Sequence, residues 1–133
     1  MKWRIYALLC LSVGFYVQEM RGETTGRKGT EKFLIAGCGW SKIAVIDKQT
    51  QQLEWEHRLN KGDDCNDVEL TRKNEILYAY TEGARLINWE QQVVWDYKVK
   101  AGEELFTATE IVRGRYLLGI CGHPARIVEL NRK

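Results

Sequence analysis

Side chains that could bind a metal or act as nucleophiles are few in this chain, which has four cysteines and two histidines among 133 residues. His123 precedes the single proline, and His57 lies in a segment that we expect to be an outer strand, so no zinc-binding set of histidines and cysteines forms. The segment DDCND at 63–67 has oxygen ligands of the kind that calcium prefers, yet it lacks the glycine and terminal glutamate of a calcium loop. We therefore predict no metal site and interpret this segment as a solvated loop.

The possible chemistry of the cysteines depends on which of them lie together. Cys38 and Cys121 occupy matching positions in the segments AGCGWSKIAVID and GICGHPARIVELN. Ligand and redox roles are open to them, but a small buried residue is the interpretation that we favour. A disulfide between them is not expected, because two repeat units separate them and a disulfide spans only a short Cα distance; Cys38 with Cys65 is the easier pair. No nucleophile–base pair, glycine-rich phosphate loop or spaced carboxylate pair is visible, so we predict no catalytic residue.

The charge of the chain is nearly balanced, with 20 Lys and Arg against 18 Asp and Glu and a net charge of +2. The charges are interspersed, which is typical of a solvated surface, and they predict no binding of nucleic acid. Hydrophobic residues make up 44% of the chain, so we expect a globular fold of one domain at most.

The N-terminus has the form of a secretory signal. A basic start precedes an uncharged stretch of 13 residues at 5–17, which is too short for a membrane-spanning helix of about 20 residues. We predict a signal peptide over 1–22, cleaved between 14 and 22, and then a polar linker over 23–32. An uncleaved membrane anchor and a buried helix are the alternatives. The expected location is secreted or periplasmic, with membrane contact only through an uncleaved signal segment.

From 33 to 133 the chain alternates short apolar or β-branched runs with polar turns. None of these runs sustains the 3.6-residue period of a helix. Ten of them are candidate strands: FLIAG, KIAVID, LEWEHR, DVELT, ILYAY, ARLINW, QVVWDYKV, ATEIV, YLLGI and ARIVEL. Evenly spaced short strands predict an all-β fold of antiparallel meanders.

A repeat of about 40 residues organises these strands. Three pairs of like residues recur at that interval: Trp55 and Trp95 (40 residues apart), Glu69 and Glu110 (41), and Arg85 and Arg126 (41). We interpret each Glu and the Arg that follows it as an ion pair between the first and third strands of a unit. Four strands in that interval are the unit of a β-propeller blade. Ten strands make about two and a half blades, so we expect part of a longer propeller, or self-association through open blade edges.

The first repeat contains a recognisable turn and tryptophan. In the segment AVIDKQTQQLEW, Asp47, Thr50 and Trp55 match an Asp-x-x-Thr-Gly-x-x-x-Trp motif, and Asn88 and Trp95 form a looser second copy. The chain thus resembles the pyrroloquinoline quinone (PQQ)-like, quinoprotein alcohol dehydrogenase-like repeat family. In such a repeat the Asp and Thr side chains close a hairpin turn, and the tryptophan lies on the outermost strand and covers the contact between blades.

The resemblance extends over 33–133 and also implies a cofactor. Quinone-dependent enzymes of that family stack PQQ between a tryptophan and a disulfide of adjacent cysteines, and hold calcium beside it. Because this chain has no Cys-Cys dipeptide, we predict no cofactor, with PQQ and calcium as the alternative. The corresponding alternative function is a fragment of a PQQ-dependent or other propeller-based enzyme.

A meander sorts its loops into two rims, because antiparallel strands alternate in direction. One rim holds the turn segments RKN, KQTQQ and RGR, which we interpret as hairpin-turn chemistry. The other rim collects chemically diverse side chains and is the candidate ligand-binding site: Cys38, Trp40, Asp63, Asp64, Cys65, Tyr80, Cys121 and His123. We therefore predict a binding or scaffold module for an unidentified ligand or protein partner.

Overall fold

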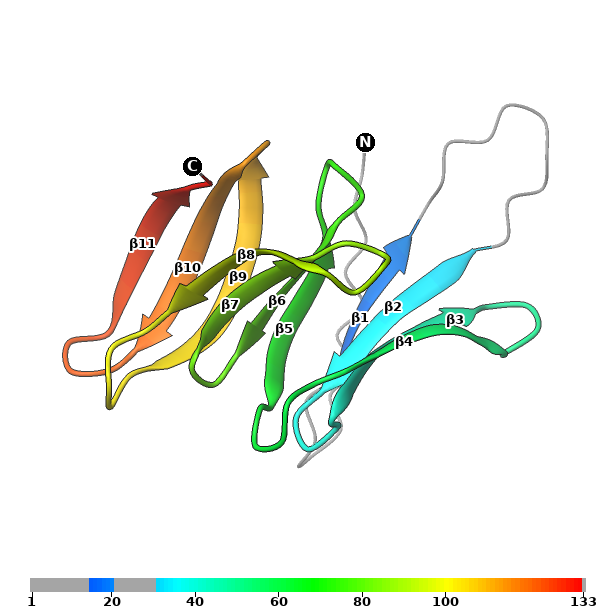
Figure 1. Cartoon of the computed structure of the whole chain (residues 1–133), viewed down its shortest axis with the longest axis horizontal. Coiled ribbons are helices and arrows are strands. Elements are labelled where there is room, and N and C mark those ends of the chain that lie inside the picture. The colour runs from blue at the N-terminus through cyan, green and yellow to red at the C-terminus, as the bar shows by residue number, and fades with distance from the viewer. Residues whose placement is uncertain (1–14, 21–30, 133) are drawn as a thin grey trace.

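The computed structural model describes residues 15–20, by their backbone, and residues 31–132. The described segments contain eleven β-strands and no helix (Figure 1). The strands are β1 Phe15–Met20, β2 Lys32–Gly37, β3 Lys42–Asp47, β4 Leu53–Arg58, β5 Cys65–Leu70, β6 Ile76–Tyr80, β7 Gly83–Ile87, β8 Val93–Lys98, β9 Glu104–Val112, β10 Arg115–Cys121 and β11 Arg126–Asn131. The prediction of an all-β chain is confirmed.

The strands form three antiparallel sheets, none of which closes into a barrel. The sheet orders are β1-β2-β3-β4, β5-β6-β7-β8 and β11-β10-β9, and we call them the first, middle and third sheets. All ten candidate strands are present as β2 to β11. Strand β1 is an addition: it lies within the segment 1–22 interpreted as a signal peptide and pairs with β2 from Phe15↔Gly37 to Met20↔Lys32. Residues 1–14 and most of the linker lie outside the described residues.

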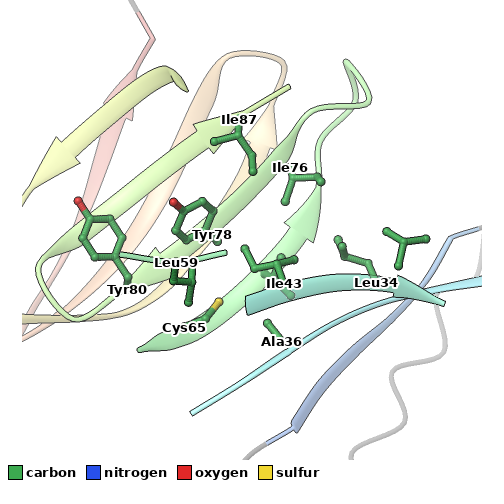
Figure 2. Close-up of a cluster of buried hydrophobic side chains, with 11 residues drawn as sticks. Leu34, Ala36, Ile43, Leu59, Cys65, Ile76, Tyr78, Tyr80 and Ile87 are labelled. Carbon is green, nitrogen blue, oxygen red and sulfur yellow. The ribbon is translucent and has the colours of Figure 1, made fainter. Parts of the chain in front are cut away.

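The middle sheet is buried on both faces. One apolar cluster fills the space between the first and middle sheets, and a second fills the space between the middle and third sheets. Figure 2 shows Leu34 and Ile43 of the first sheet in one cluster with Tyr78 and Tyr80 of β6. Every residue of β6 is buried, which explains why ILYAY is continuously apolar rather than alternating.

The turn between β3 and β4 closes as its sequence predicts. The buried carboxylate of Asp47 accepts hydrogen bonds from the backbone N–H groups of Gln49 and Thr50 at 2.9 and 2.7 Å and from the Thr50 hydroxyl at 3.1 Å. Gln51 takes a positive φ of 58°, at the position where the family motif has glycine. In the looser copy, Asn88 Oδ1 accepts the Gln92 N–H at 2.8 Å.

The two repeat tryptophans lie on outer strands and cover the contacts between sheets. Trp55 of β4 packs on the first cluster and donates its indole N–H to the Trp89 carbonyl of the middle sheet at 3.0 Å. Trp95 of β8 packs on the second cluster, with its ring centroid 4.9 Å from that of Tyr116 in the third sheet. The predicted role of these tryptophans is confirmed.

The inner strands of the middle and third sheets are joined by two carboxylates of β5. Asp67 Oδ2 accepts the Ala108 N–H at 3.2 Å and also the Thr107 hydroxyl. Glu69 accepts the Thr109 hydroxyl at 2.7 Å and also the backbone N–H of the next residue in β9.

The predicted ion pair between Glu69 and Arg85 is wrong. Glu69 lies in the same register row as Leu77 and Leu86, whose side chains face the third sheet, whereas Arg85 pairs with Tyr78 and faces the first sheet. The two side chains therefore point to opposite faces of the middle sheet. Arg85 forms its ion pair with Asp96 instead, at 2.9 Å.

The second predicted ion pair, between Glu110 and Arg126, is also wrong. Glu110 accepts the backbone N–H of Gly114 in the β9–β10 turn and that of Arg72 in the β5–β6 turn. Arg126 lies at the opposite end of the third sheet and binds Glu103. Arg126 pairs with Ile120 at the start of β11, as Gly83 pairs with Tyr80 at the start of β7. Arg85 and Arg126 are 41 residues apart, but they do not occupy equivalent positions in their sheets.

Two aspartates, Asp47 and the partly buried Asp67, are expected to affect the stability of the fold in opposite ways as the pH changes. Hydrogen bonds, first that of the Thr50 N–H, lower the pKa of Asp47 below 3.8, so its contribution to stability is present above pH 3.8 and is lost as the pH falls through the folded value. Burial raises the pKa of Asp67 above 3.8, so its contribution is complete below pH 3.8 and is lost as the pH rises through the folded value.

We expect urea unfolding at a series of pH values to separate the two sites. The free energy of unfolding of the wild type minus that of Asp47→Asn should increase as the pH rises past 3.8, and the same difference for Asp67→Asn should decrease. Two differences that follow the same trend with pH would contradict the assignment.

Candidate ligand-binding rim

Five connections between strands lie at one end of the stacked sheets (Figure 1), as expected from the alternation of strand direction. We call this end the lower rim; it consists of residues 38–41, 59–64, 81–82, 99–103 and 122–125. The turns β3–β4, β5–β6 and β9–β10 lie at the other end, which we call the upper rim.

The connections of the lower rim are bonded to one another across the sheets. Asp64 accepts the Gly39 N–H at 3.1 Å, and the Cys38 thiol lies 3.7 Å from its other oxygen. The β2–β3 turn of the first sheet therefore rests on the connection that leads into the middle sheet.

A second set of bonds continues the lower rim to the third sheet. The Val99 N–H donates to the Glu82 carbonyl at 3.0 Å, which joins the β8–β9 connection to the β6–β7 turn. Arg126 donates hydrogen bonds to Glu103 from its two terminal guanidinium nitrogens, Nη1 and Nη2, and the Nη2 bond is 2.8 Å long. The Arg126 side chain lowers the pKa of Glu103 to about 2, so this carboxylate stays ionised at neutral pH.

Six of the eight predicted site residues reach the surface of this rim. Cys38, Cys121 and His123 are exposed, and Trp40, Asp63 and Asp64 are partly exposed. Cys65 and Tyr80 are instead buried in the first cluster (Figure 2). These six residues therefore contribute to the surface at or beside the rim, and the other two support it from beneath.

The cysteines differ from what the sequence suggested. Cys38, Cys65 and Cys121 are free thiols, so the Cys38–Cys65 disulfide considered above is not formed. Cys38 and Cys121 are exposed, and our interpretation of them as small buried residues is wrong: both follow the last inward-facing residue of a strand, where the chain turns into solvent. Burial raises the pKa of the Cys65 thiol to about 12.

Sequence reasoning missed a polar cluster between the first and middle sheets. Arg85 donates to the hydroxyls of Tyr78 and Tyr80 at 3.2 and 3.1 Å as well as to Asp96. The His57 ring lies 6.0 Å from that of Tyr78, and burial lowers its pKa. The sequence did contain an indication of this cluster: Tyr78 and Tyr80 alternate in one predicted strand, and Arg85 lies in the next. The cluster gives the polar ends of buried tyrosines their partners, which is a structural role.

Within the described residues, no set of three or more histidine, cysteine, aspartate and glutamate side chains is grouped to hold a metal ion. The same residues include no helix with the length and apolar character needed to cross a membrane.

Three stacked antiparallel sheets, bonded through β5 and β9 and covered by tryptophans of β4 and β8, define an all-β protein. The family model of the Mal s 1 allergenic protein-like proteins matches residues 29–115, and the chain belongs to this family. It is similar to a crystal structure of a protein of unknown function from Bacteroides caccae, with a TM-score of 0.73 and 40% identity over 79% of this chain. This chain spans only 38% of that protein. The search of curated proteins found no match.

The family match corrects the resemblance drawn from the sequence. The chain is not assigned to the PQQ-like, quinoprotein alcohol dehydrogenase-like repeats, because the family found is the Mal s 1-like one. The residues that suggested the resemblance do what was expected of them: Asp47 and Thr50 close a turn, and Trp55 covers a contact between sheets. These tasks arise in any stack of meanders, so the motif indicates an arrangement of strands rather than a quinone site.

The three described thiols should react at very different rates. In the native protein we expect Cys38 and Cys121 to be alkylated by iodoacetamide within minutes, and Cys65 to react at least about 100-fold more slowly, because it is buried and the thiolate is the reactive form. Peptide mass mapping assigns each site, and alkylation in urea provides the control in which all sites react. Fast native alkylation of Cys65 would contradict the packing described here.

Proposed function

We propose that the three sheets are successive blades of an incomplete β-propeller. The proposal is supported by the identical strand order of the first and middle sheets and by the apolar clusters between neighbouring sheets. The bonds from Asp67 and Glu69 to β9 also support it, because they hold inner strands together where the strands of a propeller converge on its axis. The third sheet would then lack its outer strand.

On this framework we propose a non-catalytic binding or scaffold module, with an unidentified ligand or protein partner at the lower rim. The observation that carries this proposal is the set of bonded connections, which hold six side chains of four chemical kinds (thiol, carboxylate, indole and imidazole) at one end of the sheets. We also propose that the protein acts outside the cytoplasm, on the strength of its N-terminal sequence. The N-terminal residue of the protein recovered from the periplasm or medium checks this location and indicates whether β1 is retained.

Ligand binding at the lower rim should protect its exposed thiols. Carbohydrates, metabolites and peptides can be screened in this way. We expect a true ligand to slow the alkylation of Cys38 and Cys121 in the native protein. It should not change the alkylation rate of these cysteines in the unfolded protein. Trp40→Ala should remove the protection, whereas Arg58→Ala, at a side chain that is 85% exposed on β4, should preserve it. A ligand whose binding protects neither thiol would place the binding site elsewhere.

An incomplete propeller should associate through its open third sheet. Ile127 of β11 is 73% exposed and Phe106 of β9 is 53% exposed, and burying such apolar surface is worth roughly 25 cal/mol per Å². We expect sedimentation velocity to find species larger than a monomer, and Ile127→Lys to shift them to the monomer. Val93→Lys, at a 54% exposed position of β8 in the middle sheet, is the matched control. A wild type that is monomeric at about 100 μM would contradict the proposed open face.

A further inference from the structure

The upper rim carries a basic depression that neither the lower rim nor the proposed function accounts for. It has a volume of about 490 Å³ and is lined by Lys73, Arg113, Gly114, Arg115, Asn131 and Arg132. These residues come from the β5–β6 turn, the β9–β10 turn and the end of β11. The turn segments RKN and RGR, which seemed to be only hairpin chemistry, therefore bring three cationic side chains to one place, and Arg132 after β11 adds a fourth.

Two of the four cations are already neutralised and two are available. Arg132 binds Glu75 at 2.8 Å, and Arg115 binds Glu129 through its Nε at 2.7 Å. Lys73 and Arg113 are exposed at the tips of their turns, and neither forms an ion pair with another residue that the structure describes. The depression therefore offers unpaired positive charge beside guanidinium groups that keep free N–H donors.

Three backbone N–H groups beside the depression are already occupied, which leaves few of them to cradle a single phosphate. The N–H groups of Arg72 and Gly114 donate to Glu110 at 2.7 and 2.9 Å, and the Arg132 N–H donates to the Gly114 carbonyl at 2.8 Å. A compact phosphate site is usually cradled by free backbone N–H groups. Here recognition would come mainly from side chains spread over two turns and the end of β11, which suits several anionic groups along a chain.

The lining also distinguishes between kinds of acidic polymer. It contains no aromatic ring on which a nucleobase could stack and no apolar side chain that could anchor a peptide. Lysine, arginine and asparagine side chains are donors suited to carboxylate, sulfate and hydroxyl oxygens. We propose that the basic depression binds an acidic polysaccharide, carrying sulfate or carboxylate groups. This proposal does not depend on closure of a propeller or on a ligand at the lower rim.

Isothermal titration of the full chain tests the proposal with two probes, a sulfated heparin-derived oligosaccharide and a carboxylated oligogalacturonate. We expect at least one of them to bind, and its affinity to fall about 50-fold between about 50 and 200 mM NaCl if all four cations contribute. The double variant Lys73→Ala/Arg113→Ala should bind at least about tenfold more weakly, and its thermal unfolding should match that of the wild type because both side chains are exposed.

A matched double variant separates a local site from net charge. Lys61→Ala/Lys100→Ala removes the same charge from two exposed side chains of the lower rim and should leave the affinity unchanged. Equal weakening by the two double variants would overturn the proposal, as would failure of both oligosaccharides to bind at about 50 mM NaCl. Equally tight binding of oligothymidylate or polyglutamate of similar length would also overturn it, since the depression would then accept any polyanion.

Discussion

The burial of both faces of the middle sheet is the constraint around which this chain is arranged. Strand β6 has no polar face, so it requires an apolar partner on each side, and the first and third sheets supply them. The polar bonds between sheets lie at the margins of these clusters: Trp55 reaches the middle sheet at the outer edge, and Asp67 reaches β9 at the inner edge. Apolar packing provides the attraction between sheets, and the hydrogen bonds fix how the sheets are placed on one another.

The elements were predictable from sequence because each depends on local chemistry. Short apolar or β-branched runs between polar turns indicated the strands from β2 onward, and the Asp47 turn and the outer tryptophans were assigned correctly from a short motif. Strand β1 was missed because an apolar stretch after a basic start has the composition of a signal peptide. The partners of Glu69 were missed for a different reason: a shift of one residue moves a side chain to the other face of a sheet, and register cannot be read from the repeat interval alone.

The same limit applies to the candidate site. The loop clustering followed from strand alternation, but the exposure of its members depends on where each strand stops. Cys65 begins β5 and Tyr80 ends β6, and both are buried because they pack in the first cluster, whereas Cys38 lies just beyond the end of β2 and is exposed. On the upper rim, turn residues far apart in the sequence converge because the sheets stack, and no local pattern in the segments RKN and RGR indicates this. The two rims consequently differ in character, one with thiol, indole and carboxylate groups and the other predominantly basic.

The contact between Trp55 and Trp89 gives the stack a direction. The outer strand of one sheet supplies the indole, and a turn of the following sheet supplies the carbonyl that receives it. This interface thus has two different sides, an outer-strand indole on the first sheet and a turn carbonyl on the middle sheet. Copies that join through such surfaces meet head to tail, in the heterologous manner that leads to rings or open chains rather than to a two-fold dimer. The handedness and spacing of any such array would follow from the rotation and translation that relate one sheet to the next within the chain.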